Sequence, residues 1–99
     1  MRVIWSDRAL ERVEQLADYI AQDSVAAAAQ WVDDLFSQVE KLTDFPEMGK
    51  PGRGIATPGI RELVFGDFRV FYEVGTDVHV HSVWRASQLI DEDELSTGD

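Results

Sequence analysis

Three strand-like segments in the C-terminal half, joined by very short turns, constrain the fold of this chain more than any other feature. Residues 60–65, 68–74 and 78–84 are rich in β-branched and aromatic side chains, which favour strands. The first connection is Gly66-Asp67 and the second is Gly75-Thr76-Asp77, and both are typical of hairpin turns. The segments therefore predict a three-stranded antiparallel meander.

The middle segment, residues 68–74, alternates in polarity. Its even-numbered positions are apolar, whereas the odd-numbered positions are mixed and include Arg69 and Glu73. Alternation with a period of two indicates a sheet with one apolar face and one mixed face. We therefore expect helices to cover the apolar face and the opposite face to stay open for a partner.

A short strand and a helix are predicted at the N-terminus. Residues 2–5 are β-branched and aromatic, and Ser6 or Asp7 is a suitable N-cap for the helix that follows. Apolar residues then recur at helical spacing to about residue 21, which predicts an amphipathic helix.

A second helix follows a short break. Ser24 is a suitable N-cap, and apolar residues recur every three or four positions from Val25 to Leu42. The helix must end near Phe45, because Pro46 disfavours helical geometry in the residue before it. The order β-α-α-β-β-β predicts an α+β fold, with a two-helix hairpin packed on one face of an antiparallel sheet.

The length of 99 residues allows one compact domain, and two would leave neither with enough buried surface. Five of the nineteen acidic residues lie in the last nine positions, which contain no Lys or Arg. We therefore expect residues 1–90 to form a single domain and residues 91–99 to form a solvated, flexible acidic tail.

The composition also excludes several classes of function. A formal net charge of −10 disfavours generic nucleic-acid binding, because the phosphate backbone repels an acidic surface. No apolar run approaches the ~20 residues that span a bilayer, and no secretory signal is evident, so a cytoplasmic protein is expected. The chain has no cysteine, and His79 and His81 have no third ligand at a clear spacing. We expect no metal and no cofactor.

A loop rich in glycine and proline separates the helices from the strands. Residues 46–59 contain all three prolines and four of the seven glycines, together with Lys50 and Arg53. A long loop of this kind in a compact domain is more often functional than idle. It lacks the preceding strand and the spacing of a phosphate-binding loop.

Three arginines, Arg61, Arg69 and Arg85, occupy successive strand segments. A guanidinium group binds carboxylates and phosphates through two parallel hydrogen bonds, so arginines that met on the open face would anchor a partner. Alternatively, they pair with Glu62, Glu73 and neighbouring acids as solvated cross-strand partners. The charge pattern alone favours neither arrangement.

Three segments form a characteristic ordered set. They are Phe45-Pro46-Glu47-Met48-Gly49-Lys50, Gly59-Ile60-Arg61-Glu62-Leu63 and Phe68-Arg69-Val70-Phe71-Tyr72-Glu73-Val74. The set resembles the signature of ParE-type toxins in the RelE/ParE superfamily, and the resemblance extends to about Leu89. It implies a growth-arresting toxin, neutralised by an antitoxin encoded beside it whose extended C-terminal segment wraps the toxin.

The superfamily includes ribosome-dependent ribonucleases of the RelE type. Their two lysines, which alternate on the strand before the central hairpin, are replaced here by Ile60 and Glu62. Arg69 keeps the arginine after the turn, but the second basic pair is reduced to Arg85 beside Ala86. No tyrosine follows Tyr72 either, so the catalytic tyrosine of the tail is missing.

The resemblance therefore implies a non-enzymatic toxin of the ParE type, which binds DNA gyrase and traps it on cut DNA. Gln88 matches a glutamine of ParE relatives, although Arg85 stands where they often have histidine. The expected partner-binding residues are Lys50, Arg53, Arg61, Arg69, Arg85 and Gln88. One alternative is an mRNA ribonuclease that uses Arg61, Arg69 and Arg85. Another is an inactive homologue that only binds its antitoxin and contributes to operator repression.

Overall fold

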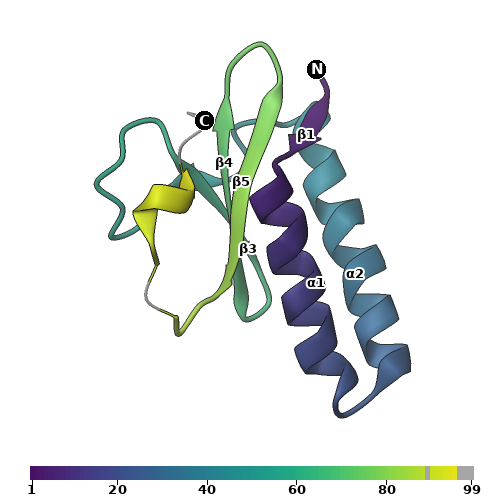
Figure 1. The fold of residues 1–99 in the computed structure, drawn as a ribbon. Helices are drawn as coiled ribbons and strands as arrows, with labels where there is room; N and C mark the ends of the chain where they lie inside the picture. The colour runs from purple at the N-terminus through teal and green to yellow at the C-terminus, as the bar shows by residue number, and fades with distance from the viewer. Residues whose placement is uncertain (89, 96–99) are drawn as a thin grey trace.

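The computed structural model describes residues 1–88 and 90–95 and shows two helices packed against a sheet (Figure 1). The helices are α1 (Asp7–Ala21) and α2 (Val25–Glu40), followed by the short 3₁₀ helix η1 (Lys41–Thr43). The strands are β1 (Val3–Trp5), β2 (Lys50–Pro51), β3 (Arg61–Phe65), β4 (Phe68–Val74) and β5 (Val78–Arg85), and a 3₁₀ helix η2 (Glu92–Leu95) follows. The predicted α+β fold is confirmed.

The sheet itself is mixed, not purely antiparallel as predicted. Its order is β1-β5-β4-β3-β2, and β1 runs parallel to β5, with Val3 in register with Val78. A parallel pair needs a long crossover connection, which the helices and the intervening strands provide. The sequence also gave no indication of β2, because two residues that include Pro51 show no periodicity.

Both predicted helix starts are confirmed by their caps. The Ser6 hydroxyl accepts a hydrogen bond from the Ala9 N–H at 2.9 Å, and the Ser24 hydroxyl accepts one from Ala27 at 3.0 Å. Each cap satisfies one N–H group that has no partner within the helix.

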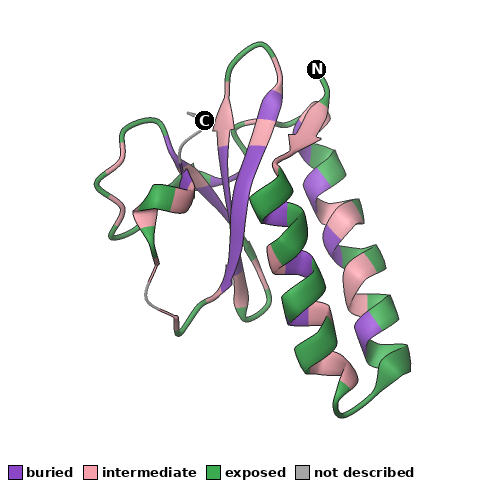
Figure 2. Cartoon of the chain, viewed as in Figure 1, coloured by how far each residue is buried: buried purple, intermediate pink, exposed green. Residues whose placement is uncertain are grey.

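The helices bury one face of the sheet in an apolar core (Figure 2). Leu35 and Val39 of α2 meet Val70, Tyr72 and other alternate residues of the strands in this core. The even-numbered positions of β4 therefore face the helices, as the alternation predicted. None of the helices in the described part of the chain is long and apolar enough to cross a membrane.

The opposite face of the sheet is partly covered, which differs from the predicted open face. Leu95 of η2 is 1% exposed and packs in a second cluster with Ile60, Phe71 and Trp84. The first residues of the expected acidic tail thus lie against the sheet, since burial of Leu95 holds them there. Residues 96–99 of that expected tail lie outside the described residues, and a domain boundary at residue 90 stays a prediction.

Candidate functional site

An ion cluster around the buried Glu62 lies on the face of the sheet opposite the helices, which we call the second face. The Glu62 carboxylate is 2% exposed and accepts two hydrogen bonds, each 3.0 Å long, from the guanidinium of Arg69, which is 8% exposed. The backbone N–H of Arg53 donates to the same carboxylate at 2.7 Å, and the Arg53 guanidinium donates two further bonds of 3.2 Å. A buried carboxylate is tolerated when charged donors surround it in this way.

The ionisation of Glu62 follows from these contacts. Burial raises the pKa of the Glu62 carboxyl, but hydrogen bonds from Arg69 and Arg53 outweigh it and lower the pKa from 4.5 to about 2. Glu62 is therefore ionised at neutral pH, and its charge is neutralised by the two guanidinium groups. It cannot act as a general base with a pKa near 7.

The same cluster holds the Gly/Pro loop against the sheet. Besides its bonds to Glu62, Arg69 donates to the backbone carbonyl of Arg53 at 2.7 Å. Farther along the loop, the Glu92 carboxylate of η2 accepts hydrogen bonds from the backbone N–H groups of Ala56 and Thr57 and from the Thr57 hydroxyl. These bonds lower the pKa of Glu92. Two carboxylates thus hold the loop at Arg53 and at Ala56 and Thr57.

A second carboxylate–guanidinium pair joins η2 to the first helix. Arg12 donates two hydrogen bonds to Glu94, of 3.1 and 2.7 Å, and its guanidinium lies 3.8 Å from the ring centroid of Trp84. The hydroxyl of Ser82 donates to Glu94 at 2.9 Å. Burial alone would raise the pKa of Glu94, but the bonds from Arg12 and Ser82 lower it.

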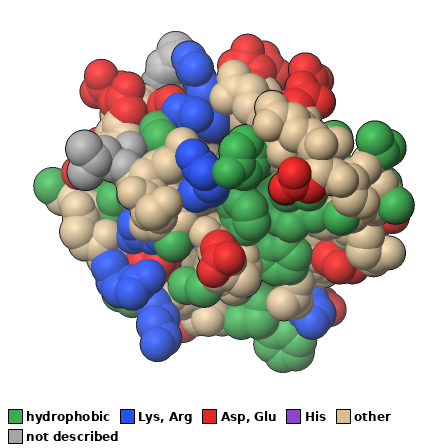
Figure 3. Space-filling view, turned by 90° about the horizontal axis from the view of Figure 1, so that it is seen from below, with side chains coloured by type: hydrophobic (Ala, Val, Ile, Leu, Met, Phe, Trp, Pro, Cys, Tyr) green, Lys and Arg blue, Asp and Glu red, His purple; other side chains and the backbone are tan. Residues whose placement is uncertain are grey.

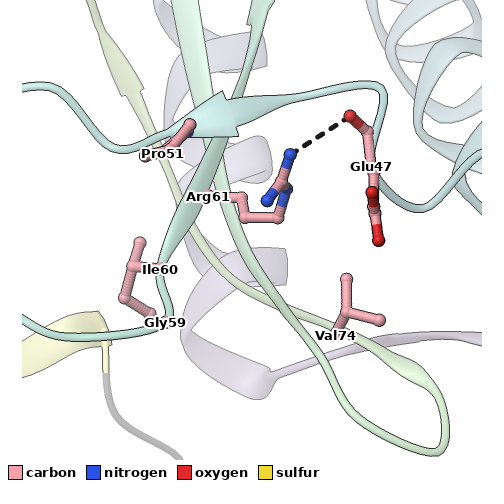
Figure 4. Close-up of a pocket in the computed structure, with 6 residues that line it drawn as sticks. All are labelled: Glu47, Pro51, Gly59, Ile60, Arg61 and Val74. Carbon is pink, nitrogen blue, oxygen red and sulfur yellow. Dashed lines mark hydrogen bonds between the residues drawn. The ribbon is translucent and has the colours of Figure 1, made fainter.

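Arg61 points to the helix side, into the beginning of the loop. Its Nη2 donates to the backbone carbonyls of Glu47 at 3.2 Å and Gly49 at 2.6 Å, and the first of these bonds is drawn in Figure 4. The side chain lines a pocket of about 330 Å³ together with Glu47, Pro51, Gly59, Ile60 and Val74. Arg61 is therefore engaged by the chain's own backbone.

Arg85 lies at the end of β5, close to α1. Its guanidinium is 4.8 Å from the ring centroid of Tyr19. Arg85 also lines a pocket of about 390 Å³, together with residues that include Asp67 and Phe68. The side-chain oxygen of Gln88 accepts a hydrogen bond from the backbone N–H of Arg85 at 2.7 Å. Gln88 thus closes the turn after the strand.

The three strand arginines do not meet on one face of the sheet. They therefore cannot form a joint anchor for a partner, which was one of the two arrangements considered from the sequence. Arg61 is in register with Tyr72 of the helix-side core, Arg85 stacks on Tyr19 of α1, and Arg69 alone reaches the second face. The alternative, pairing with strand acids, is correct for Arg69 and Glu62, but the pair is buried instead of solvated.

The two histidines of β5 lie beside an irregularity in its pairing with β4. An irregularity between Phe71 and Tyr72 shifts the register, so that Phe71 faces Ser82 and Tyr72 faces Val80. His81 consequently lies 3.1 Å from the Glu73 carboxylate, while Val83 is buried in the helix-side core. A bulge cannot be inferred from alternation alone.

Exposed apolar side chains surround the start of the loop. Phe45 is 64% exposed, Met48 is 42% exposed and Val64 is 55% exposed. Lys50 and Arg53 are exposed close to them. A separate strip of apolar side chains lies on the side of the molecule that Figure 3 shows from below, with most of the visible Lys and Arg side chains on one side of it. An apolar patch with a basic rim is typical of a protein-binding surface.

Comparison with known proteins identifies the family of the chain. The family model described as the ParE toxin of the type II toxin–antitoxin system parDE matches residues 3–90. The chain belongs to the ParE toxin family. It is therefore a toxin of a type II toxin–antitoxin system, and the family implies an antitoxin partner.

Two relatives and one solved structure agree with this membership. A Sinorhizobium fredii protein named "Putative toxin Y4kP" is 36% identical over 89 residues, which cover 88% of this chain and 90% of the relative. "Toxin RelE2" of Caulobacter vibrioides is 32% identical over 90 residues, covering 89% and 98%. The structure "Chromosomal ParDE TA system from P. aeruginosa" shares the fold, with a TM-score of 0.73, 23% identity and coverage of 86% and 95%.

Some residues of this ParE-family site were missed by the sequence analysis. Glu62 was interpreted as the replacement of a lysine and as a solvated partner of a strand arginine, and not as the buried centre of an ion cluster. Tyr72 was assigned to the core, but its hydroxyl also donates to the Pro46 carbonyl at 2.8 Å and accepts from the Gly49 N–H at 2.9 Å. In both cases the only indication in the sequence was a polar residue at a strand position where an apolar one would be expected.

Proposed function

We propose that this ParE-family toxin arrests growth by binding and inhibiting DNA gyrase, without catalysing a reaction. The observation that carries this proposal is the buried pairing of Glu62 with Arg69, to which the exposed Arg53 adds a second guanidinium. The ribonuclease branch uses free cations on this part of the sheet to stabilise the cleaved phosphodiester, which requires unpaired positive charge. Here the Arg69 guanidinium is buried and paired with Glu62, so its charge is not free.

Neighbouring positions support the same choice. Ile60 replaces one lysine of the ribonuclease branch and is 5% exposed in the second apolar cluster, so it cannot present a charge. The hydroxyl of Tyr72, the last tyrosine in the sequence, is bonded within the loop. A protein that acts by binding needs none of these groups to be free.

We assign the contacts with partners to the members of the predicted set that are exposed or partly exposed. Lys50 and Arg53 lie on the loop, and Arg85 lies with Gln88 beside the pocket at the end of β5. Arg61 and Arg69 of that set are assigned a structural role, because their side-chain donors bind groups of the chain itself. The proposed site of action is the cytoplasm, where DNA gyrase works.

A side-by-side assay tests the proposal. The purified toxin is added to a gyrase supercoiling reaction and to an mRNA-programmed translation mixture, and supercoiling and mRNA integrity are measured over the same concentration range. We expect loss of supercoiling with intact mRNA. Cleavage of mRNA without gyrase inhibition would overturn the proposal, and the resemblance to a relative named "Toxin RelE2" makes this the competing outcome.

The same assay distinguishes an active toxin from an inactive homologue. A toxin that impairs neither gyrase nor mRNA, and whose expression without antitoxin leaves growth unchanged, would be a binding partner of the antitoxin only. That result would equally overturn gyrase inhibition as the function.

A further inference from the structure

The charge of Arg61 has no counter-charge in the part of the chain that the structure describes. Five of the seven arginines form an ion pair with a carboxylate there, whereas Arg61 donates only to the neutral carbonyls of Glu47 and Gly49. Arg85 also lacks such a pair, but it lies against the ring of Tyr19. Arg61 is only partly exposed, so water solvates its charge incompletely. An anion beside Arg61 would therefore be stabilised.

Most of the hydrogen-bond donors of Arg61 are unused. A guanidinium group has five N–H donors, and both contacts of Arg61 with backbone carbonyls use the same atom, Nη2. Within residues 1–88 and 90–95, Nε is buried without a hydrogen-bond partner, and Nη1 donates to no other group. A buried N–H without an acceptor carries a desolvation cost, which a bound acceptor would offset. Arg61 can thus hold the loop through Nη2 and still bind a ligand.

Arg61 lines a pocket that is large enough for a small molecule. The pocket has a volume of about 330 Å³, which lies at the lower end of the range of ~300–1,000 Å³ that is typical of ligand sites. It lies between the segment that precedes β2 and the end of β4 (Figure 4). Besides Arg61 and Glu47, its lining consists of one glycine and three apolar residues, Pro51, Ile60 and Val74. One part of the pocket is therefore charged and another part is apolar.

A carboxylate of opposite charge lines the same pocket. Glu47 is exposed, and its backbone carbonyl accepts a hydrogen bond from Arg61, but the two side chains form no ion pair in the described structure. In Figure 4 the Glu47 side chain extends from its backbone towards Val74. A simple anion beside Arg61 would be repelled by Glu47, and a simple cation beside Glu47 would be repelled by Arg61. The pair of charges favours a ligand that carries both signs.

We propose that this pocket binds a small zwitterion, a free amino acid with an apolar side chain. Its carboxylate accepts hydrogen bonds from the unused donors of Arg61, its ammonium group donates to the Glu47 carboxylate, and its side chain lies against Val74 and the other apolar residues of the pocket. Each charge of the ligand then meets an opposite charge of the protein. The inference uses none of the residues assigned to contacts with gyrase and does not depend on gyrase as the target.

An NMR titration of the purified toxin with leucine tests the site. The Nε–H signal of Arg61 and the methyl signals of Val74 are followed, and the same titration is made with isocaproate, which lacks the ammonium group, and with isoamylamine, which lacks the carboxylate. We expect saturable shifts of both signals with leucine. The two half-ligands should bind at least about 10-fold more weakly, because each loses hydrogen bonds to a charged group.

Two results of this titration would overturn the proposal. Isocaproate that binds as tightly as leucine would show that the pocket takes a simple anion and that Glu47 has no part in recognition. Shifts that do not saturate with leucine would show that the toxin has no amino-acid site.

A pair of matched variants assigns the binding to this pocket. Glu47→Gln removes the exposed carboxylate of the pocket, whereas Glu40→Gln makes the same change at an exposed glutamate at the end of α2. We expect Glu47→Gln to weaken leucine binding at least about 10-fold without weakening that of isocaproate, and Glu40→Gln to change leucine binding less than about 2-fold. Equal effects of the two variants would place the ligand elsewhere and overturn the assignment.

Arg61→Gln provides the complementary test on the anion side. It should abolish the saturable shift of the Val74 methyl signals with leucine, because the ligand carboxylate loses its charged donor. Unchanged leucine binding by a folded Arg61→Gln variant would contradict the proposal. If the variant does not fold, because Nη2 no longer holds the loop, the comparison of Glu47→Gln with Glu40→Gln decides the question.

Discussion

The two faces of the sheet are buried by different means. On the helix side, residues such as Leu35, Val39 and Val70, which are at most 1% exposed, pack in one apolar core. On the other side, burial depends on carboxylates held by guanidinium groups, Glu62 by Arg69 and Glu94 by Arg12, around a smaller apolar cluster. The first face excludes water by contact between apolar side chains, whereas the second satisfies buried charges.

This difference explains which groups are available for function. An apolar core tolerates the loss of one side chain by partial relaxation, whereas a buried charge without its partner retains its full desolvation cost. The charges of the second face therefore hold the loop and η2 in position and are not free for chemistry. The groups left for partners are those at the rim, on the loop and at the end of β5.

Breaking the ion cluster should produce the largest effect. Glu62→Leu leaves the Arg69 guanidinium buried without a counter-charge, which should lower the free energy of unfolding by about 3–5 kcal/mol. Reversible denaturant unfolding measures this. The matched control is Glu73→Leu, because the Glu73 side chain is 45% exposed beside His81, and its loss should cost less than about 1 kcal/mol. Equal losses would mean that burial does not distinguish the two carboxylates.

The apolar face should respond somewhat less to a single change. Leu35→Ala removes a side chain that is 0% exposed in the helix-side core and should cost about 3 kcal/mol through lost burial and a residual cavity. Leu10→Ala, at a position 44% exposed on α1, should cost less than about 0.5 kcal/mol. If Leu35→Ala were as mild as its control, α2 would not be packed as described.

Acidification should sharpen the contrast, because it protonates the carboxylates of the second face and leaves the apolar core uncharged. The pKa of Glu62 is lowered from 4.5 to about 2, so its ionised form stabilises the fold at and above neutral pH. This stabilisation is lost as the pH falls from about 4.5 towards 2. We expect the unfolding free energy of Glu62→Gln to depend less on pH in that window than that of the parent, and parallel curves would contradict this.

Much of the fold could be predicted from the sequence. The alternation in residues 68–74 assigned the buried face correctly, and Ser6 and Ser24 marked the helix starts, because local periodicity and capping suffice for such elements. The parallel pairing of β1 with β5 could not be predicted, since it depends on contacts between residues about 75 positions apart.

The candidate site could be predicted only in part. The basic residues and the Gly/Pro loop were identified as belonging to a surface, but their pairing was not. Charge pattern could not distinguish a solvated Glu62 from a buried one, because its partners, Arg53 of the loop and Arg69 of β4, meet it only in the folded sheet. The bulge that places His81 beside Glu73 is likewise a property of the paired strands.

A double-mutant cycle of Glu62 and Arg69 tests most directly whether these charges are structural. The unfolding free energy and gyrase inhibition are measured for Glu62→Leu, Arg69→Leu and the double variant. We predict that the double variant regains at least about 2 kcal/mol relative to Glu62→Leu, since no charge is then buried alone, and that it still inhibits gyrase. A double variant that is stable but no longer inhibits gyrase would contradict the account, because Arg69 would then itself act on the target.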